Sequence, residues 1–112
     1  MEKIYQQALL YDFYGELLTE HQRSVYEDAV CNDLSLGEIA QDRGISRQGV
    51  HDLIRRCDKI LQEYESKLRL VEKFMNAREK VAKIIDLTQE PEQCADRLRE
   101  IHCLAMELQQ EL

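Results

Sequence analysis

The amino-acid sequence predicts an all-α protein, a helix-turn-helix bundle with a long fourth helix and a C-terminal helix. Apolar residues recur three and four positions apart along most of the chain, which is the period of a helix that buries one face. Helix-start signals precede these stretches, and one proline and four glycines are the only strong helix breakers in 112 residues. This length is typical of one domain with a small core.

The first predicted helix covers residues 4–14, and Gly15 suits the position just after its end. Thr19 and Gln22 have the spacing of a capping box, in which each side chain bonds the backbone N–H of the other residue. This box predicts the start of a second helix, which runs to about Val30. The second helix is expected to bury Val25, Tyr26 and Ala29.

The next two helices have the layout of a helix-turn-helix. Ser35 and Glu38 form a second capping box, and Gly44 permits the left-handed backbone of a tight turn. Ser46 then caps the fourth helix, and Ile45 before it is expected to pack on the core. The inner face of the short third helix is formed by Leu36, Ile39 and Ala40. Such a motif places its second helix in the major groove of DNA.

The fourth helix shows no stop signal, and a heptad pattern continues far along it. Its apolar positions are Val50, Ile54, Cys57, Leu61, Tyr64, Leu68, Val71 and Met75. If it is continuous over residues 46–86, the helix spans roughly 60 Å. One small domain cannot cover that length, so the distal part needs a partner, either the last helix of the same chain or another subunit. We predict a homodimer or higher homo-oligomer through the fourth or the last helix, with the self-association residues Leu61, Tyr64, Leu68, Val71 and Met75. Alternatively, Arg78 marks a bend that keeps the pattern within one chain.

The last predicted helix begins near Pro91, a residue that suits the first helical turn. Its apolar stripe consists of Cys94, Leu98, Ile101, Ala105, Leu108 and Leu112. The chain is therefore divided into a helix-turn-helix domain with a long fourth helix, residues 1–88, and a C-terminal helix, residues 89–112.

Polar and basic residues on the outer side of the fourth helix are the candidate nucleic-acid contacts. They are Ser46, Arg47, Gln48, His51, Arg55, Arg56 and Lys59. Arg47 suits guanine and Gln48 suits adenine, each through two hydrogen bonds. The basic side chains of Arg55, Arg56 and Lys59 suit contacts with phosphates. The alternative interpretation is an ordinary helical bundle with solvated charges on its surface.

The charge pattern limits how such binding would behave. The net charge is −7, from 22 acids and 15 bases, although residues 46–86 hold ten bases against seven acids. Binding to nucleic acid is therefore expected to be weak and salt-sensitive.

Other classes of function find little support in the sequence. Cys31, Cys57, Cys94 and Cys103 lack zinc-site spacing, so we expect reduced, mostly buried thiols and no metal. The absence of a long apolar run or a signal peptide indicates a cytoplasmic protein without membrane insertion. No catalytic constellation or cofactor motif is present, so we expect a non-enzymatic protein without a cofactor.

Two resemblances follow from these residues. The segment from Glu38 to Val50 resembles region 4 of bacterial sigma factors. The wider pattern, which includes FYGELLT at 13–19, ISRQGV at 45–50 and KILQEYESKL at 59–68, resembles the YlxM family of small helix-turn-helix proteins of Gram-positive bacteria over about residues 1–88. His51 departs from the tyrosine more often expected at that position.

The YlxM resemblance implies a regulatory or accessory role in the signal recognition particle pathway. The implied partners are the particle's GTPase subunit, its small RNA or its receptor. The alternative is a homodimeric DNA-binding transcription regulator, in which the heptad pattern would join two recognition helices.

Overall fold

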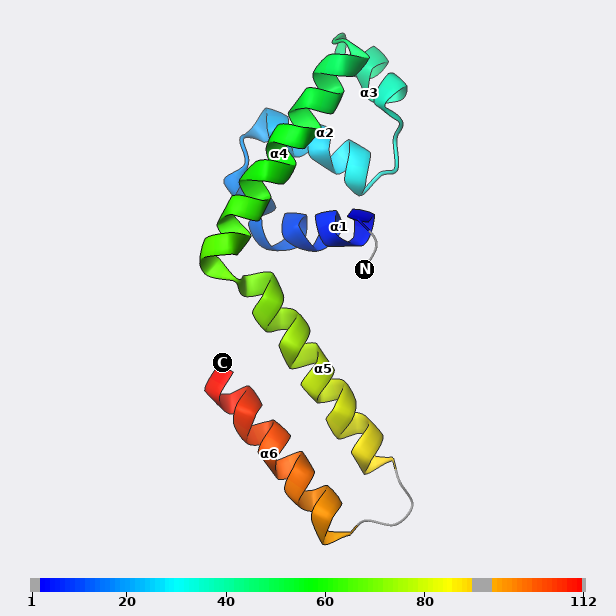
Figure 1. The fold of residues 1–112 in the computed structure, drawn as a ribbon. Coiled ribbons are helices and arrows are strands. Elements are labelled where there is room, and N and C mark those ends of the chain that lie inside the picture. Colours follow the sequence, from blue (N-terminus) through cyan, green and yellow to red (C-terminus); the bar gives the residue numbers. More distant parts are fainter. Residues whose placement is uncertain (1–2, 90–93, 112) are drawn as a thin grey trace. The chain divides into compact units, whose positions relative to one another are not determined.

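The computed structural model describes residues 3–89 and 94–111, and the elements in these ranges are all helices (Figure 1). The chain divides into two compact units, residues 1–69 and 70–112. Unit 1 contains α1 (Lys3–Tyr14), the 3-10 turn η1 (Gly15–Leu17), α2 (Glu20–Val30), α3 (Leu36–Arg43) and α4 (Arg47–Leu68). Unit 2 contains α5 (Leu70–Thr88) and α6 (Ala95–Glu111). The all-α prediction is confirmed.

The connection from α1 to α2 depends on a glycine for lack of space. Gly15 is buried, and a Cβ atom built on it would lie 2.8 Å from the ring of Tyr11. Any larger residue would therefore displace that ring. Gly15 thus follows the end of α1 as predicted. It is needed because the Tyr11 ring leaves no space for a Cβ atom, and its φ is not positive.

Both predicted capping boxes are present. The hydroxyl oxygen of Thr19 accepts from the N–H of Gln22 at 3.2 Å, and the Gln22 side chain accepts from the Thr19 N–H at 3.1 Å. Ser35 and Glu38 repeat this exchange at the start of α3, at 3.1 and 3.2 Å. These boxes satisfy N–H groups that the first turn of a helix leaves without backbone partners.

The helix-turn-helix is held by a small apolar core. Val25, Ile39 and Val50 are fully buried, and Ala40 is 7% exposed where α3 packs against the other helices. Their surroundings are the partly buried Ala29, Leu34, Leu36, Leu53 and Ile54. These contacts join α2, α3 and the first turns of α4, which confirms the inner faces predicted for them.

Polar contacts attach the middle of α4 to the first two helices. The hydroxyl of Tyr26, a fully buried residue, donates to Asp58 Oδ1 at 2.5 Å. The Gln7 amide donates to both oxygens of the same carboxylate at 3.0 Å. Farther along α4, the Tyr14 hydroxyl donates to Glu65 Oε1 at 2.5 Å. Two carboxylates of α4 are therefore held by groups of α1 and α2.

Residues 46–86 do not form one continuous helix, and the helix is interrupted at Arg69 and not at Arg78. α4 ends at Leu68, and Arg69 adopts the left-handed conformation with φ 54°, its N–H bonding the Glu65 carbonyl. A non-glycine residue in this region ends the helix because its backbone turns out of the α-helical path. The two compact units thus meet at Arg69–Leu70, whereas the sequence division was placed at residue 88.

Unit 2 is an antiparallel pair of helices (Figure 1). Lys80 of α5 forms ion pairs with Glu107, at 3.3 Å, and Glu111 of α6. These pairs raise the pKa of the Lys80 ammonium, the Glu111 contact most of all. No described residue of α5 or α6 is fully buried. The predicted helix start near Pro91 lies outside the described residues, and α6 begins at Ala95.

Two smaller predictions were wrong because exposure depends on the tertiary neighbours. Ile45 is 38% exposed, so it does not join the core. The four thiols are free, but only Cys57 is buried, whereas Cys31, Cys94 and Cys103 are exposed. Burial raises the pKa of the Cys57 thiol to about 11. This cysteine therefore acts as a small apolar core residue.

Candidate nucleic-acid interface

The turn between α3 and α4 has the geometry that a helix-turn-helix requires. Gly44 ends α3 with φ 67° and ψ 30°, and its N–H bonds the carbonyl of Ala40. The N–H of Ile45 bonds the same carbonyl at 3.1 Å. A residue with a Cβ is disfavoured in this left-handed conformation, so glycine fixes the direction in which α4 leaves the turn.

Ser46 orients the first turn of α4. Its backbone is extended, and its hydroxyl oxygen accepts from the N–H of Gly49 at 2.9 Å. A Cβ atom on Gly49 would lie only 3.1 Å from that oxygen, so a small residue keeps the cap accessible. The Ser46 hydroxyl hydrogen is not used by this cap and is available to a phosphate oxygen.

The predicted contact residues of α4 are all exposed. They are Ser46, Arg47, Gln48, His51, Arg55, Arg56 and Lys59. Helical spacing places Arg47, His51, Arg55 and Lys59 along one side, each four residues after the last. We call this row the α4 basic face. Gln48 lies one position round the helix from Arg47 and borders the row.

Asp52 limits the basic face at one edge. The Gln48 amide donates to Asp52 Oδ1 at 2.9 Å, and His51 Nδ1 lies 3.9 Å from the same oxygen. The Gln48 amide must therefore leave Asp52 before it can bond an adenine with both of its polar groups.

Arg56 is separated from the α4 basic face. It lines a hollow of about 470 Å³ between the start of α2 and α4. The other residues lining this hollow are Thr19, His21, Gln22, Gly49, Asp52 and Leu53. The structure thus brings most of the predicted bases together and directs Arg56 toward α2.

Arg43, the basic residue at the end of α3, is paired with a carboxylate inside unit 1 and does not add to the α4 basic face. Its guanidinium donates to Asp28 Oδ2 and to the Ser24 hydroxyl, both at 2.7 Å, and so attaches α3 to α2. The Arg43 hydrogen bond is the main reason that the pKa of the Asp28 carboxyl lies below its usual value. Sequence reasoning gave Arg43 no such role, because the partners lie 15 and 19 residues away.

The predicted self-association residues are divided between the two units. Leu61 is fully buried inside unit 1 and is therefore unavailable to a second chain. Tyr64 stacks on Tyr14 with ring centroids 6.1 Å apart, and Leu68 is 48% exposed at the end of α4. Val71 and Met75 are half-buried and belong to α5, in the other unit.

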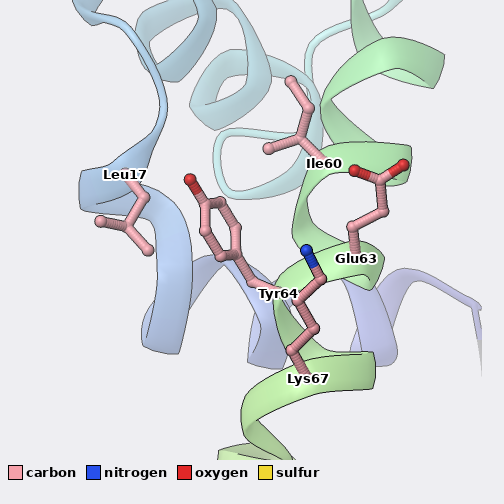
Figure 2. A pocket seen from close by; sticks show the side chains of 5 residues that line it. All are labelled: Leu17, Ile60, Glu63, Tyr64 and Lys67. Carbon is pink, nitrogen blue, oxygen red and sulfur yellow. The ribbon is translucent and has the colours of Figure 1, made fainter.

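Unit 1 carries a second hollow, of about 390 Å³, beside the distal part of α4 (Figure 2). Leu17, Ile60 and Tyr64 supply its apolar walls, and Glu63 and Lys67 supply its charged groups.

The part of the chain that the structure describes contains neither a metal-ligand cluster nor a membrane-spanning helix. Among residues 3–89 and 94–111, no three histidine, cysteine or acidic side chains are close enough to share a metal ion. In the same residues, the apolar stretches of the helices are too short or too charged to span a bilayer.

Comparisons with known proteins agree with this geometry. Residues 1–101 match a family described as "Putative helix-turn-helix protein, YlxM / p13 like". The chain is 43% identical over 106 residues to a UPF0122 protein of Thermoanaerobacter sp. (strain X514), covering 92% of this chain and 91% of that protein. It is 42% identical over 101 residues to a UPF0122 protein of Bacillus thuringiensis (strain Al Hakam), covering 90% and 92%. The helix-turn-helix of α3 and α4 and these matches together show that the chain belongs to the UPF0122 family of YlxM/p13-like helix-turn-helix proteins.

Proposed function

We propose that this protein is a non-enzymatic, cytoplasmic regulatory or accessory protein of the signal recognition particle pathway, and that it binds nucleic acid through the α4 basic face. The observation that carries the nucleic-acid part is the division of charge around α4. Arg47, His51, Arg55 and Lys59 face outward, whereas Asp58 and Glu65 accept hydrogen bonds from α1 and α2. Although the net charge of the chain is −7, the α4 basic face thus presents basic side chains to the phosphates of a nucleic acid.

The number of bases on the face predicts how strongly salt affects binding. Arg47, Arg55 and Lys59 offer three phosphate contacts. Counterion release then gives a slope of log affinity against log salt of roughly −2 to −3. The protein's overall negative charge lowers the affinity further, because it repels the same phosphates at long range.

The pathway role rests on the family resemblance, and the particle's small RNA is the first partner to test. The major groove of a regular RNA helix is too deep and narrow for side chains to read. Recognition by α4 would therefore use phosphates and the unstacked bases of a loop or bulge. The acidic surface outside the α4 basic face also suits a basic protein partner such as the particle's GTPase subunit or its receptor.

The test is equilibrium binding of the labelled small RNA to the full chain, with a double-stranded DNA of similar length as comparison. We expect the RNA to bind more tightly, with affinity falling as salt rises. Arg47→Ala and Gln48→Ala should each weaken binding. Lys67→Ala is the matched control, because Lys67 is an exposed base on the last turn of the same helix, beside the second hollow. Failure of the RNA to bind at low salt, or equal losses for Arg47→Ala and Lys67→Ala, would contradict the proposal.

A transcription regulator is the second candidate, favoured by the position of Arg47 and Gln48 in the first turn of α4. This end of a recognition helix meets base edges in the major groove of DNA. Selection of duplexes from a random pool distinguishes the candidates. A recurrent two-half-site sequence whose binding depends on Arg47 and Gln48 would support a homodimeric DNA reader, and enrichment of no sequence would exclude it.

A further inference from the structure

The α5–α6 hairpin of unit 2 has apolar side chains but encloses no core. None of its described residues is fully buried, and several large apolar side chains remain well exposed. Two helices alone can shield only the line along which they touch, and stable helical bundles normally bring four helices around one core.

The line of contact between α5 and α6 is fixed by Lys80, which pairs with Glu107 and Glu111. Half-buried residues continue this line along both helices. They are Ile84 and Leu87 on α5, with Ile101, Leu104 and Leu108 on α6.

Three of the exposed apolar residues lie to one side of this line, whereas Met106, 46% exposed, lies on the outer face of α6. Val81 and Ile85 each follow a contact residue of α5 by one position, and Leu98 of α6 precedes Ile101 by three. At 3.6 residues per turn, one position forward rotates the side chain by about 100° around the helix axis, and three positions back is equivalent to about 60° in the same direction. In an antiparallel pair, equal rotations in the two helices point to the same side of the pair. Val81, Ile85 and Leu98 therefore lie on one side of the hairpin, and they are 46%, 49% and 56% exposed.

We call this side the hairpin stripe. Ala82 and Ala105 extend it, and its α5 part lines a shallow groove of about 330 Å³. The small alanine side chains leave room for the side chains of another helix to approach closely.

Charge separates the hairpin stripe from the rest of unit 2. By the same helical phase, the described acids lie on the opposite side of the contact line. These acids are Glu72, Glu79 and Asp86 on α5, with Asp96, Glu100, Glu107 and Glu111 on α6. Arg78 lines the groove along the α5 part of the stripe, and its guanidinium carbon lies 5.7 Å from the centre of the Phe74 ring. An aromatic face can hold such a cation favourably in a desolvated setting. By the same phase, the exposed His102 lies on the α6 part.

We propose that the hairpin stripe is the surface on which a second copy of this chain docks, so that two hairpins form a four-helix bundle. A two-fold interface places the same surface of each copy against the other. Two acidic chains repel wherever their carboxylates would face one another, and the stripe is a part of unit 2 where apolar groups would meet instead. Docking there would also give the hairpin the buried core that it lacks alone.

This interface replaces the one that the heptad pattern predicted. Leu61 is fully buried inside unit 1, whereas Val81, Ile85 and Leu98 remain exposed. The stripe is distinct from the α4 basic face, so dimerisation and nucleic-acid binding can be tested separately.

The test is sedimentation equilibrium of the full chain over a wide range of concentrations. We expect a species of twice the 13.2 kDa chain mass for the unmodified protein. The double substitution Val81→Glu with Ile85→Glu should give a monomer. Leu17→Glu is the control, because it introduces the same residue type, with one added charge, at an apolar position that is 54% exposed in unit 1.

A second variant guards against misfolding of the hairpin. Val81→Ala with Ile85→Ala keeps good helix formers and removes only apolar surface. It should raise the dimer dissociation constant at least about tenfold while helix content, measured by circular dichroism, is retained. A monomeric unmodified chain at every concentration would overturn the proposal. So would a dimer that survives the alanine variant and is lost in Leu17→Glu.

Discussion

Replacing Tyr26 with phenylalanine removes one hydroxyl group from the interior of unit 1 and leaves the ring in place. That hydroxyl donates to Asp58 Oδ1 at 2.5 Å, and Tyr26 is fully buried. Tyr26→Phe therefore tests whether the carboxylate of α4 is held by the helices beneath it, as the division of charge around α4 requires.

The expected loss follows from what remains after the substitution. A hydrogen bond to a charged group contributes about 1.5–3 kcal/mol. The Gln7 amide still donates to both oxygens of Asp58, so the carboxylate is not left without a donor. We therefore expect the lower part of that range, about 1.5–2 kcal/mol. For a domain of this size, such a loss lowers the melting temperature by roughly 6–16 °C.

Tyrosine fluorescence measures this loss in unit 1 alone. The chain has no tryptophan, and its five tyrosines all lie within residues 1–69. Tyr5→Phe is the matched control, because Tyr5 is 41% exposed and surface changes of this kind stay within about 0.5 kcal/mol. The reasoning is refuted if Tyr26→Phe and Tyr5→Phe change the free energy of unfolding by the same small amount.

Three further predictions concern the turn, the pH response and the edge of the interface. Gly44→Ala should cost about 1–2 kcal/mol in chemical unfolding because of the positive φ at this residue, whereas Gly37→Ala, a helical position with room for a Cβ, should be neutral or slightly stabilising. Burial, followed by the Glu27 hydrogen bond, raises the pKa of Tyr11 to about 12, and burial with the Asp58 hydrogen bond also raises the pKa of Tyr26 well above 10. The folded state holds these two hydroxyl protons more tightly than the unfolded state does. Their contribution to the free energy of unfolding should therefore be complete below pH 10 and should fall as pH rises toward 12, and phenolate absorbance should appear at higher pH in the native than in the unfolded protein. A free energy of unfolding that stays unchanged over that range would contradict the prediction. Asp52→Asn should raise nucleic-acid affinity roughly two- to tenfold in the binding assay by removing a carboxylate beside the phosphates, and an unchanged or lower affinity would place the contact elsewhere.

The helix-turn-helix could be predicted in detail because its signals are local. The capping pairs at Thr19 and Ser35 and the glycine at residue 44 each act within a few positions, so the residue types themselves specify where α2 and α3 begin and where α3 ends. The exposed residues of the α4 basic face followed from helical period alone.

The interruption at Arg69 could not be predicted in the same way. Arginine is a good helix former, and the apolar spacing continues through Leu68 and Val71 without a break. A heptad pattern reports that one face is apolar and does not report what covers it. Cys57 and Leu61 are buried within unit 1, so the pattern arises from two separate packing surfaces.

The partners of Arg43 and Asp58 were also beyond sequence reasoning. Each of these charges is bonded to side chains at least 15 residues away, and such pairs depend on how α1, α2 and α4 pack. They matter to the candidate site because they decide which charges near α4 are already compensated.

The central claim is that the first turns of α4 bind nucleic acid. The most direct measurement is a titration of the isotope-labelled full chain with the particle's small RNA, followed by the NMR shifts of backbone amides. We predict that the largest shifts fall within residues 46–59, that they weaken with salt, and that they diminish in Arg47→Ala. Shifts concentrated in α5 and α6, or no shifts at low salt, would contradict the account.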